Sequence, residues 1–467
     1  MSKLIIQNGN MCELDLPLKF AQKLYNEFAI RHPNAFYLRT RQRGMQNWDG
    51  KIHYITKTGQ FKIGLLPKVY DMCIEMGIKP KVVDMRQPLP KVSKVVTNIG
   101  KYKLRPEQEK AVKSVINNRV GDTPFHIGVL DYTVNAGKTL IMSSLYLTYK
   151  KQLKTLLITN DSDWLNQARE EFKQYLPGED ITFVQGKVLN WSNFTIGMVQ
   201  SISRNMRFYQ KELSQIDMVL VDEADQGGSK QYQNVITRLF NTRIRIGLSG
   251  TIYMSKLAKD KVKNMNLECF FGKVIAEFKL KDSIKKGYST KTIVKMVPGK
   301  PWYGNWESDC ISYKEIYDDS ITENNTAWTM AYNRLRWNIN QGRYPALVVC
   351  KHIAHCENLY KFFKKKLGDA YNIAYVHVNT PSKLRQQIMR DFREGKIDIL
   401  VSTTIIARGK NFPKLRYLLN AASMDSQEKS IQFLGRLVRT DKSKKKVYLD
   451  DLHYPGPYLD RHGKHRK

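Results

Sequence analysis

The chain has 467 residues, more than one hydrophobic core usually organises, so two or three domains are expected. Its 77 Lys and Arg residues outnumber 43 Asp and Glu residues, and the net charge of +34 favours nucleic acid as a partner over an anionic membrane surface. No apolar run approaches the roughly 18 residues of a membrane span, and the first residues lack the apolar core of a signal peptide. These features exclude export and membrane insertion and predict a cytoplasmic protein. The six cysteines match no common zinc-binding spacing and are expected to be reduced thiols.

The first compositional unit, residues 1–95, is predicted to be a nucleic-acid-binding domain that ends at a basic, proline-rich linker. Residues 36–44 alternate as a strand does, which would place three arginines on one face, and the Asp-Gly turn that follows carries an aromatic and a lysine. Such a surface can track phosphates. A solvated strand face beside a core tryptophan is an equal alternative. The residues concerned are Arg39, Arg41, Arg43, Trp48 and Lys51.

Short apolar runs alternate with longer helical patterns from residue 101 onward, which is typical of a parallel sheet covered by helices. The expected strands of the first lobe are 127–130, 155–159, 194–198, 218–221 and 243–248. The pattern restarts after a polar, aromatic stretch, with expected strands at 346–350, 373–376, 397–401 and 415–419. The fold is therefore predicted to be α/β, with a lobe at 96–286, a linker or insertion at 287–330, a second lobe at 331–452 and a fraying basic tail at 453–467.

A phosphate-binding loop is predicted between the first strand and the helix that follows it. Such a loop needs backbone N–H groups at a helix start, a lysine that reaches the β- and γ-phosphates, and a hydroxyl for magnesium. The matching residues are Asn135, Ala136, Gly137, Lys138 and Thr139. Asn135 stands where glycine is usual, and asparagine tolerates a left-handed backbone better than most residues. Tyr132 departs from the pattern, because a small residue usually begins the loop.

Two carboxylates close the apolar strand 218–221 and would emerge at the carboxyl edge of a parallel sheet. In a nucleotide triphosphatase, Asp222 would help to hold magnesium while Glu223 orients or deprotonates the attacking water. Asp225 is instead expected to couple the site to residues 249–251. A surface acidic turn is the alternative interpretation.

Two arginines, Arg436 and Arg439, stand three residues apart in the second lobe and would share one face of a helix. They can stabilise the charge of a transferring phosphoryl group. A solvated basic helix is the alternative.

The order of these motifs resembles that of the superfamily 2 helicases over residues 104–452. Residues 104–108 resemble the motif whose glutamine contacts adenine, residues 402–409 resemble motif V, and residues 432–439 resemble motif VI. This resemblance implies two RecA-like lobes and the cofactors ATP and Mg²⁺. It adds four nucleotide-binding residues to the loop: Arg105, Gln108, Gly409 and Gln432.

Within that superfamily the chain looks most like the phage UvsW-type recombination helicases. The Asp-Glu-Ala-Asp tetrad at 222–225 suggests DEAD-box RNA helicases, but the neighbouring motifs differ from theirs, with residues 160–165 in place of Pro-Thr-Arg-Glu-Leu and Ile431-Gln432 in place of His-Arg. The resemblance implies a DNA helicase that remodels branched DNA and R-loops. We expect a monomer, located in the host cytoplasm if a phage encodes it. An RNA helicase, a duplex translocase and a nucleic-acid-binding protein with a vestigial ATPase remain alternatives.

Polar and basic residues near strand ends of the two lobes are candidate contacts to the nucleic-acid backbone, because phosphate contacts position a strand without reading its sequence. Helix capping is the alternative role for each of them. The candidates are Gln200, Ser201, Arg204, Lys351, His352 and Thr404.

Overall fold

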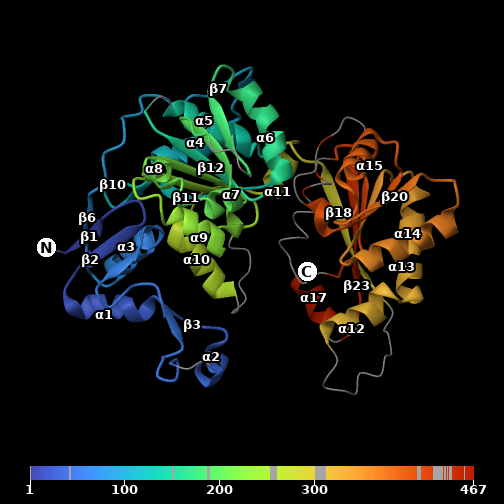
Figure 1. Ribbon diagram of the computed structural model, residues 1–467, viewed down its shortest axis with the longest axis horizontal. Helices are drawn as coiled ribbons and strands as arrows, with labels where there is room; N and C mark the ends of the chain where they lie inside the picture. Colours follow the sequence, from blue (N-terminus) through green and yellow to red (C-terminus); the bar gives the residue numbers. More distant parts are fainter. Residues whose placement is uncertain are drawn as a thin grey trace. The chain divides into compact units, whose positions relative to one another are not determined.

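The computed structural model divides into two compact units, Met1–Lys279 and Leu280–Lys467, whose elements are drawn in Figure 1. The residues that it describes are 2–41, 44–149, 152–186, 190–252, 260–299, 312–407, 412–423, 435, 438, 440, 444–456 and 458–466.

The amino-terminal part of the first unit is a small α+β domain, as predicted. Its sheet has the order β5-β2-β1-β6, in which β1 pairs antiparallel with β2 and parallel with β6. Alternate residues of β1 and β2 are buried, as expected for strands with one face against a core. The elements are β1 (Lys3–Ile6), β2 (Met11–Asp15), α1 (Leu18–Glu27), β5 (Gln60–Lys62), η1 (Ile63–Leu65), α3 (Leu66–Glu75) and β6 (Lys81–Asp84).

An arm between α1 and β5 corrects one expectation, because the strand predicted at 36–44 is the helix α2 (Ala35–Arg41). The arm pairs β3 (Ala29–Arg31) with β4 (Lys51–His53), so the Asp-Gly turn leads into β4 without closing a two-residue hairpin. The alternation failed as a signal because α2 faces solvent: Ala35 is the only buried residue of this helix. Without a buried face, a period of two has no packing consequence. Arg39 and Arg41 are therefore about 200° apart around the helix and do not share a face.

The first large sheet has seven parallel strands in the order β13-β14-β12-β15-β16-β11-β17. The five strands predicted for this lobe are confirmed, and each is almost entirely buried. The two edge strands were not predicted, because each is less buried and less uniformly apolar. The strands are β11 (Ile127–Tyr132), β12 (Thr155–Thr159), β13 (Ile181–Val184), β14 (Phe194–Met198), β15 (Met218–Asp222), β16 (Ile244–Ser249) and β17 (Val274–Phe278).

Helices cover both faces of this sheet. Figure 1 shows α4, α5 and α6 on one side of the strands and α9 and α10 on the other. The remaining elements of the lobe are β7 (Asn98–Ile99), β8 (Tyr102–Lys103), α4 (Pro106–Ile116), β9 (Arg119–Val120), β10 (Thr123–Pro124), α5 (Lys138–Thr148), α6 (Ser162–Tyr175), α7 (Val199–Arg204), α8 (Gln210–Ser214), η2 (Ala224–Gln226), α9 (Lys230–Ile236) and α10 (Lys261–Phe271).

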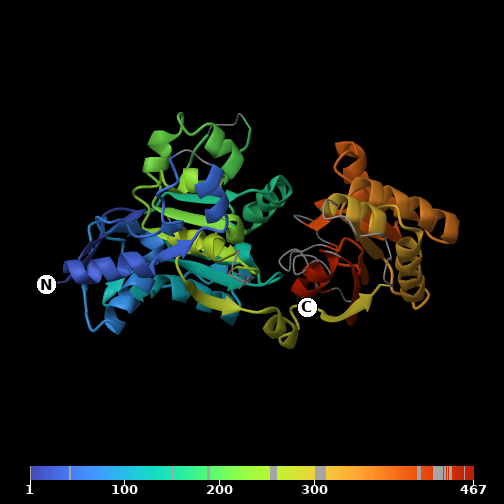
Figure 2. The ribbon, with the colours of Figure 1, turned by 90° about the horizontal axis from the view of Figure 1, so that it is seen from below.

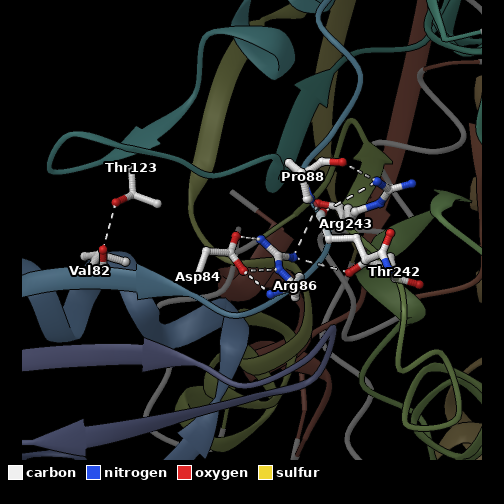
Figure 3. A network of polar contacts seen from close by, with 8 residues as sticks. Val82, Asp84, Arg86, Pro88, Thr123, Thr242 and Arg243 are labelled. Carbon is white, nitrogen blue, oxygen red and sulfur yellow. Dashed lines mark hydrogen bonds and ion pairs between the residues drawn. The ribbon is translucent and has the colours of Figure 1, made fainter.

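The amino-terminal domain and the first lobe share one hydrophobic core, and the small blue sheet lies beside the large sheet in both views (Figure 1 and Figure 2). The guanidinium of Arg245, fully buried in β16, donates to the carbonyl of Gly9 at 2.6 Å and to the side chain of Asn10 at 2.8 Å. Polar contacts of the segment that joins the two parts also hold the parts together (Figure 3). Arg86 bonds Asp84 and the Thr242 carbonyl, Arg243 donates to the Pro88 carbonyl, and Thr123 donates to the Val82 carbonyl.

The second unit contains a six-stranded parallel sheet in the order β18-β23-β22-β19-β21-β20. The four predicted strands are confirmed. Strand β18 lies within the range assigned to a linker, and it pairs with all eight residues of β23. The strands are β18 (Lys291–Pro298), β19 (Ala346–Cys350), β20 (Ile373–Val376), β21 (Ile399–Thr403), β22 (Tyr417–Asn420) and β23 (Lys446–His453).

Helices of the second unit include one within the segment that was expected to fray. Residues 459–466 form α17, in which Leu459 is buried and the ring of His462 lies 3.1 Å from the Ser423 carbonyl. The helical elements are α11 (Leu280–Lys285), α12 (Tyr313–Tyr317), the π-helical turn η4 (Asp318–Thr322), α13 (Asn325–Ile339), α14 (Ile353–Leu367), α15 (Ser382–Glu394), η5 (Thr404–Ala407) and α17 (Leu459–Arg466).

Five of the six cysteines lie within the described residues, and all five are buried free thiols. In the same part of the chain, no helix has the length and apolarity that a membrane crossing needs.

Candidate nucleotide site and nucleic-acid contacts

The predicted phosphate loop lies between the end of β11 and the start of α5, as the motif requires. Asn135 has a φ of 63° and Gly137 a φ of 72°, so both adopt the left-handed backbone. Asn135 therefore takes the conformation expected of it. A Cβ atom at Gly137 would lie 2.3 Å from Nε2 of Gln108, so only glycine fits there without displacing that side chain.

Tyr132, the departure from the usual loop pattern, points away from the loop. Its ring is fully buried beside Phe278, and its hydroxyl donates to the Glu107 carbonyl at 2.8 Å. The Tyr132 carbonyl faces the loop instead and accepts a hydrogen bond from Nζ of Lys138 at 3.3 Å. The large side chain thus occupies the core and leaves the loop backbone in place.

Arg105 and Gln108, at the start of α4, contact the loop backbone. Nε2 of Gln108 donates to the Ala136 carbonyl at 2.8 Å, and the Arg105 guanidinium donates to the Asn135 carbonyl at 3.1 Å. The Gln108 side chain also accepts a hydrogen bond from the Arg105 backbone N–H at 2.8 Å. These contacts bring the predicted adenine motif and the predicted phosphate loop together. Thr139 follows in the first turn of α5.

Asp222 ends the buried strand β15 and is only 4% exposed. Burial raises the pKa of its carboxyl to about 7; the nearby Lys138 ammonium lowers this pKa, and Glu223 raises it. Glu223 follows with a φ of 52°, a left-handed conformation that is strained for glutamate. The predicted carboxylate pair and Lys138 therefore belong to one electrostatic site.

Three buried polar atoms around this site have no hydrogen-bond partner among the described residues: Asp222 Oδ1, Glu223 Oε2 and Asn135 Nδ2. Buried polar groups are normally paired, and unpaired ones are typical of a site that receives a ligand. A carboxylate and the hydroxyl of Thr139 are hard oxygen ligands that suit Mg²⁺. Within the described ranges, no cluster of three His, Cys, Asp or Glu side chains can hold a metal.

Asp225 connects the site to β16. Its Oδ1 accepts a hydrogen bond from the Ser249 hydroxyl at 2.8 Å, and Ser249 Oγ accepts one from the Thr251 backbone N–H at 3.1 Å. The expected coupling of Asp225 to residues 249–251 is confirmed.

The candidate nucleic-acid contacts of the first lobe lie around the start of α7. Gln200 donates to the Asn160 carbonyl at 3.3 Å, the Ser201 hydroxyl accepts from the Gly186 N–H at 3.0 Å, and Arg204 is exposed at the end of α7. Asn160 was not among the predicted contacts, and its side chain donates to Gln226 in η2 at 2.7 Å. This bond joins the candidate contacts to the segment that follows Glu223. The position of Asn160, directly after a buried strand, could have marked it as a candidate contact.

In the second unit, aromatic rings hold Lys351. Its Nζ donates to the Tyr313 hydroxyl at 2.7 Å and lies 4.2 Å from the centre of that ring and 5.1 Å from that of Tyr317. His352 precedes α14, and burial lowers the pKa of its ring. Thr404 begins η5 directly after β21. These three residues follow strand ends, as expected.

On the arm, Arg39 and Arg41 are exposed, and the Arg41 guanidinium lies 4.9 Å from the centre of the Tyr37 ring. Trp48 is partly buried, and its indole N–H donates to the Lys51 carbonyl at 2.9 Å. The exposed large aromatic side chains of the arm, among the described residues, are those of Phe36 and Tyr37, which were not among the predicted contacts. Five predicted site residues lie outside the described part of the chain: Arg43, Gly409, Gln432, Arg436 and Arg439.

Two family models match the chain. "Type III restriction enzyme, res subunit" matches residues 101–254, and "Helicase conserved C-terminal domain" matches residues 331–441. Together they cover more than half of the chain.

Related proteins and structures agree with these models. The ATP-dependent DNA helicase uvsW of Enterobacteria phage T4 is 21% identical over 436 residues, which are 87% of this chain and 82% of that protein. The protein named "Putative helicase 22" of Sulfolobus islandicus filamentous virus is 22% identical over 385 residues, 76% of this chain, and the chain spans only 64% of its length. The structure of S. cerevisiae Dbp5 bound to RNA and ADP BeF3 has a TM-score of 0.54 at 14% identity, over 78% of this chain and 88% of that one. The chain therefore belongs to the superfamily 2 helicases, ATP-hydrolysing enzymes with two RecA-like lobes.

Proposed function

We propose that the protein is an ATP-dependent DNA helicase or translocase that remodels forks, junctions and R-loops in recombination, repair or replication. The observation that carries this proposal is the extent of the similarity to the phage T4 DNA helicase. It covers 87% of this chain, which is more than the two matched helicase domains together. The net charge of +34 supports a nucleic-acid substrate.

The nucleotide site has a separate role for each of its side chains. Lys138 binds the β- and γ-phosphates, Thr139 and Asp222 hold Mg²⁺, and Glu223 orients or deprotonates the attacking water. The metal, when bound, neutralises charge on the phosphates. Residues 432–439 resemble motif VI of the superfamily 2 helicases, and this resemblance assigns Arg436 and Arg439 to the γ-phosphate of ATP.

The backbone of the nucleic acid is proposed to contact residues of both RecA-like lobes and of the arm. Exposed Arg204 and the short polar residues around it suit phosphate contact. The lobe residues included are Gln200, Ser201, Arg204, Lys351, His352 and Thr404.

An RNA helicase is the second candidate. The Asp-Glu-Ala-Asp sequence at 222–225 favours it, since RNA helicases carry this tetrad. The positive charge of the chain serves either nucleic acid, because phosphate binding is independent of sequence and of sugar.

The rate of ATP hydrolysis, measured separately with single-stranded DNA, forked DNA, linear duplex DNA and RNA, tests the proposal. Forked DNA should stimulate hydrolysis more than the linear duplex does. Stimulation by RNA alone would replace the DNA assignment with the RNA one, and equal stimulation by fork and linear duplex would favour a translocase that does not act on branches.

Replacement of both Arg39 and Arg41 by alanine should weaken DNA binding and flatten its salt dependence. Each neutralised phosphate contributes about 0.9 to the slope of log K against log salt on duplex DNA, so the slope should fall by up to about 2. The measurement is a salt titration of DNA affinity. The matched control replaces Lys19 and Lys79, two exposed lysines elsewhere in the same domain, by alanine. Equal slopes for the two double variants would make the arm an ordinary surface.

A further inference from the structure

Two neighbouring aromatic side chains on α2 are exposed to an unusual degree. Phe36 is 80% exposed and Tyr37 is 54% exposed, and both are among the large apolar side chains left open to solvent in the described residues. Consecutive helical residues lie about 100° apart, so the two rings cover adjoining sectors of one short helix. Figure 1 shows α2 at the end of the arm, away from the large sheet of its unit. Apolar surface displayed in this way marks an interaction site.

Local hydrogen bonds hold the backbone of the helix that carries these rings. The Ala35 N–H donates to the His32 carbonyl at 3.0 Å, and the His32 N–H donates to the Gly50 carbonyl at 2.8 Å. The Thr40 hydroxyl lies 3.0 Å from the Phe36 carbonyl and 3.1 Å from that of Tyr37. The rings are thus presented by a defined backbone, which lowers the entropy lost when a ligand stacks on them.

The charge of the arm identifies the chemistry of the ligand. Residues 29–56 contain the basic residues Arg31, Arg39, Arg41, Arg43 and Lys51, and Asp49 is their only acidic residue. The Asp49 carboxylate is already bound by His53 at 2.6 Å and by the Lys51 N–H at 2.9 Å. Aromatic faces beside arginines are how proteins bind single-stranded nucleic acid, because every base can stack and every nucleotide carries a phosphate. An apolar protein partner would not explain this excess of positive charge.

The arm is also fixed to the first RecA-like lobe. Tyr54, one residue after β4, donates from its hydroxyl to Asn266 in α10 at 3.0 Å, and its N–H donates to the Phe28 carbonyl at 3.0 Å. The buried Arg245 contacts to residues 9 and 10 join the same domain to β16. An element that separates strands must move with the motor that pulls them, and this attachment provides that coupling.

We propose that Phe36 and Tyr37 form a stacking platform for unpaired bases of one DNA strand, and that this platform holds the strands apart at a branch point. The role in strand separation rests on the helicase function proposed above, whereas the stacking itself does not. Arg41, held over the Tyr37 ring, contacts the phosphate of a stacked nucleotide.

The direct test is the affinity of the full-length protein for a single-stranded oligonucleotide without ATP. Replacement of both Phe36 and Tyr37 by alanine should weaken binding about tenfold, because aromatic stacking typically contributes this much or more per base. The salt slope should stay that of the wild type, since no charge is removed. Replacement of both by leucine should weaken binding similarly, and replacement of both by tryptophan should restore it. Wild-type affinity in the alanine double variant would overturn the platform and favour a protein partner for α2.

The rate at which a forked duplex is unwound tests whether the platform holds the strands apart at a branch point. The alanine double variant should separate a forked duplex at least about tenfold more slowly, while its ATP hydrolysis with single-stranded DNA falls much less. The control is Phe208→Ala, which removes a 77% exposed aromatic ring elsewhere in the first unit and should unwind like the wild type. Wild-type unwinding by the alanine double variant would overturn this inference and leave the proposed helicase function unaffected. No DNA-stimulated ATP hydrolysis in the wild type would overturn the proposed function, and the oligonucleotide affinity would still decide the platform. Unchanged melting temperatures exclude misfolding.

Discussion

Lys138→Ala should lower the rate of ATP hydrolysis by about 10³-fold, which is the size of effect seen when a charge-stabilising group is removed from phosphoryl transfer. Lys138 begins α5, its Nζ lies 3.3 Å from the Tyr132 carbonyl, and its charge acts directly on Asp222. Removal of this ammonium leaves the phosphates without their cation at the helix start. The measurement is steady-state ATP hydrolysis with saturating single-stranded DNA.

Nucleic-acid binding by the Lys138→Ala variant should change little, because the positive charge of the protein is distributed over 77 Lys and Arg residues. The matched control is Lys110→Ala, which removes an exposed lysine from α4 and should keep wild-type turnover. Retained hydrolysis in Lys138→Ala would place the nucleotide site elsewhere in the chain. Equal losses of hydrolysis and DNA affinity would mean that the substitution had unfolded the lobe.

Asp222→Asn should have two opposite effects, a loss of ATP hydrolysis and a gain of stability in the free protein. Hydrolysis should fall by about 10²-fold to 10³-fold, because a neutral amide holds Mg²⁺ poorly. Stability should rise because burial raises the pKa of Asp222 from 3.8 to about 7. Between these two values the folded state binds a proton that the unfolded state has released. The free energy of unfolding therefore decreases as pH rises through this window. Above pH 7 the ionised Asp222 carboxylate destabilises the folded state by its full amount.

Thermal unfolding without nucleotide or Mg²⁺ checks the sign of this effect. At about pH 8 the Asp222→Asn variant should melt roughly 2–5 °C above the wild type, and at about pH 4 the difference should nearly vanish. Asp122→Asn, at an exposed site in the same lobe, serves as the matched control. A variant that melts below the wild type at pH 8 would show that the Asp222 carboxylate is stabilised by its surroundings, contrary to its burial.

Nine of the thirteen strands of the two large sheets could be predicted, because parallel strands buried on both faces are continuous apolar runs, as in β12 and β19. Edge strands give a weaker signal in the sequence, because they are less buried and less uniformly apolar. Strand β18 has no regular apolar pattern, carries two lysines and is mostly open to solvent, so its pairing with β23 is visible only in the fold. The same reason explains α2, whose exposed residues carry no burial pattern that would distinguish a helix from a strand.

The sequence by itself determined the phosphate loop, because phosphate binding requires particular residue types at fixed spacing beside a strand and a helix, and the order of its motifs carried the resemblance to the helicase family. It also indicated that Asn135 can replace a glycine, since the conformational preference of asparagine is local. Only the tertiary structure decided that the Tyr132 ring enters the core, that Arg105 and Gln108 contact the phosphate loop and that burial raises the pKa of Asp222. Each of these depends on elements distant in the chain, and burial and long-range contacts are properties of the packed molecule that local spacing does not contain.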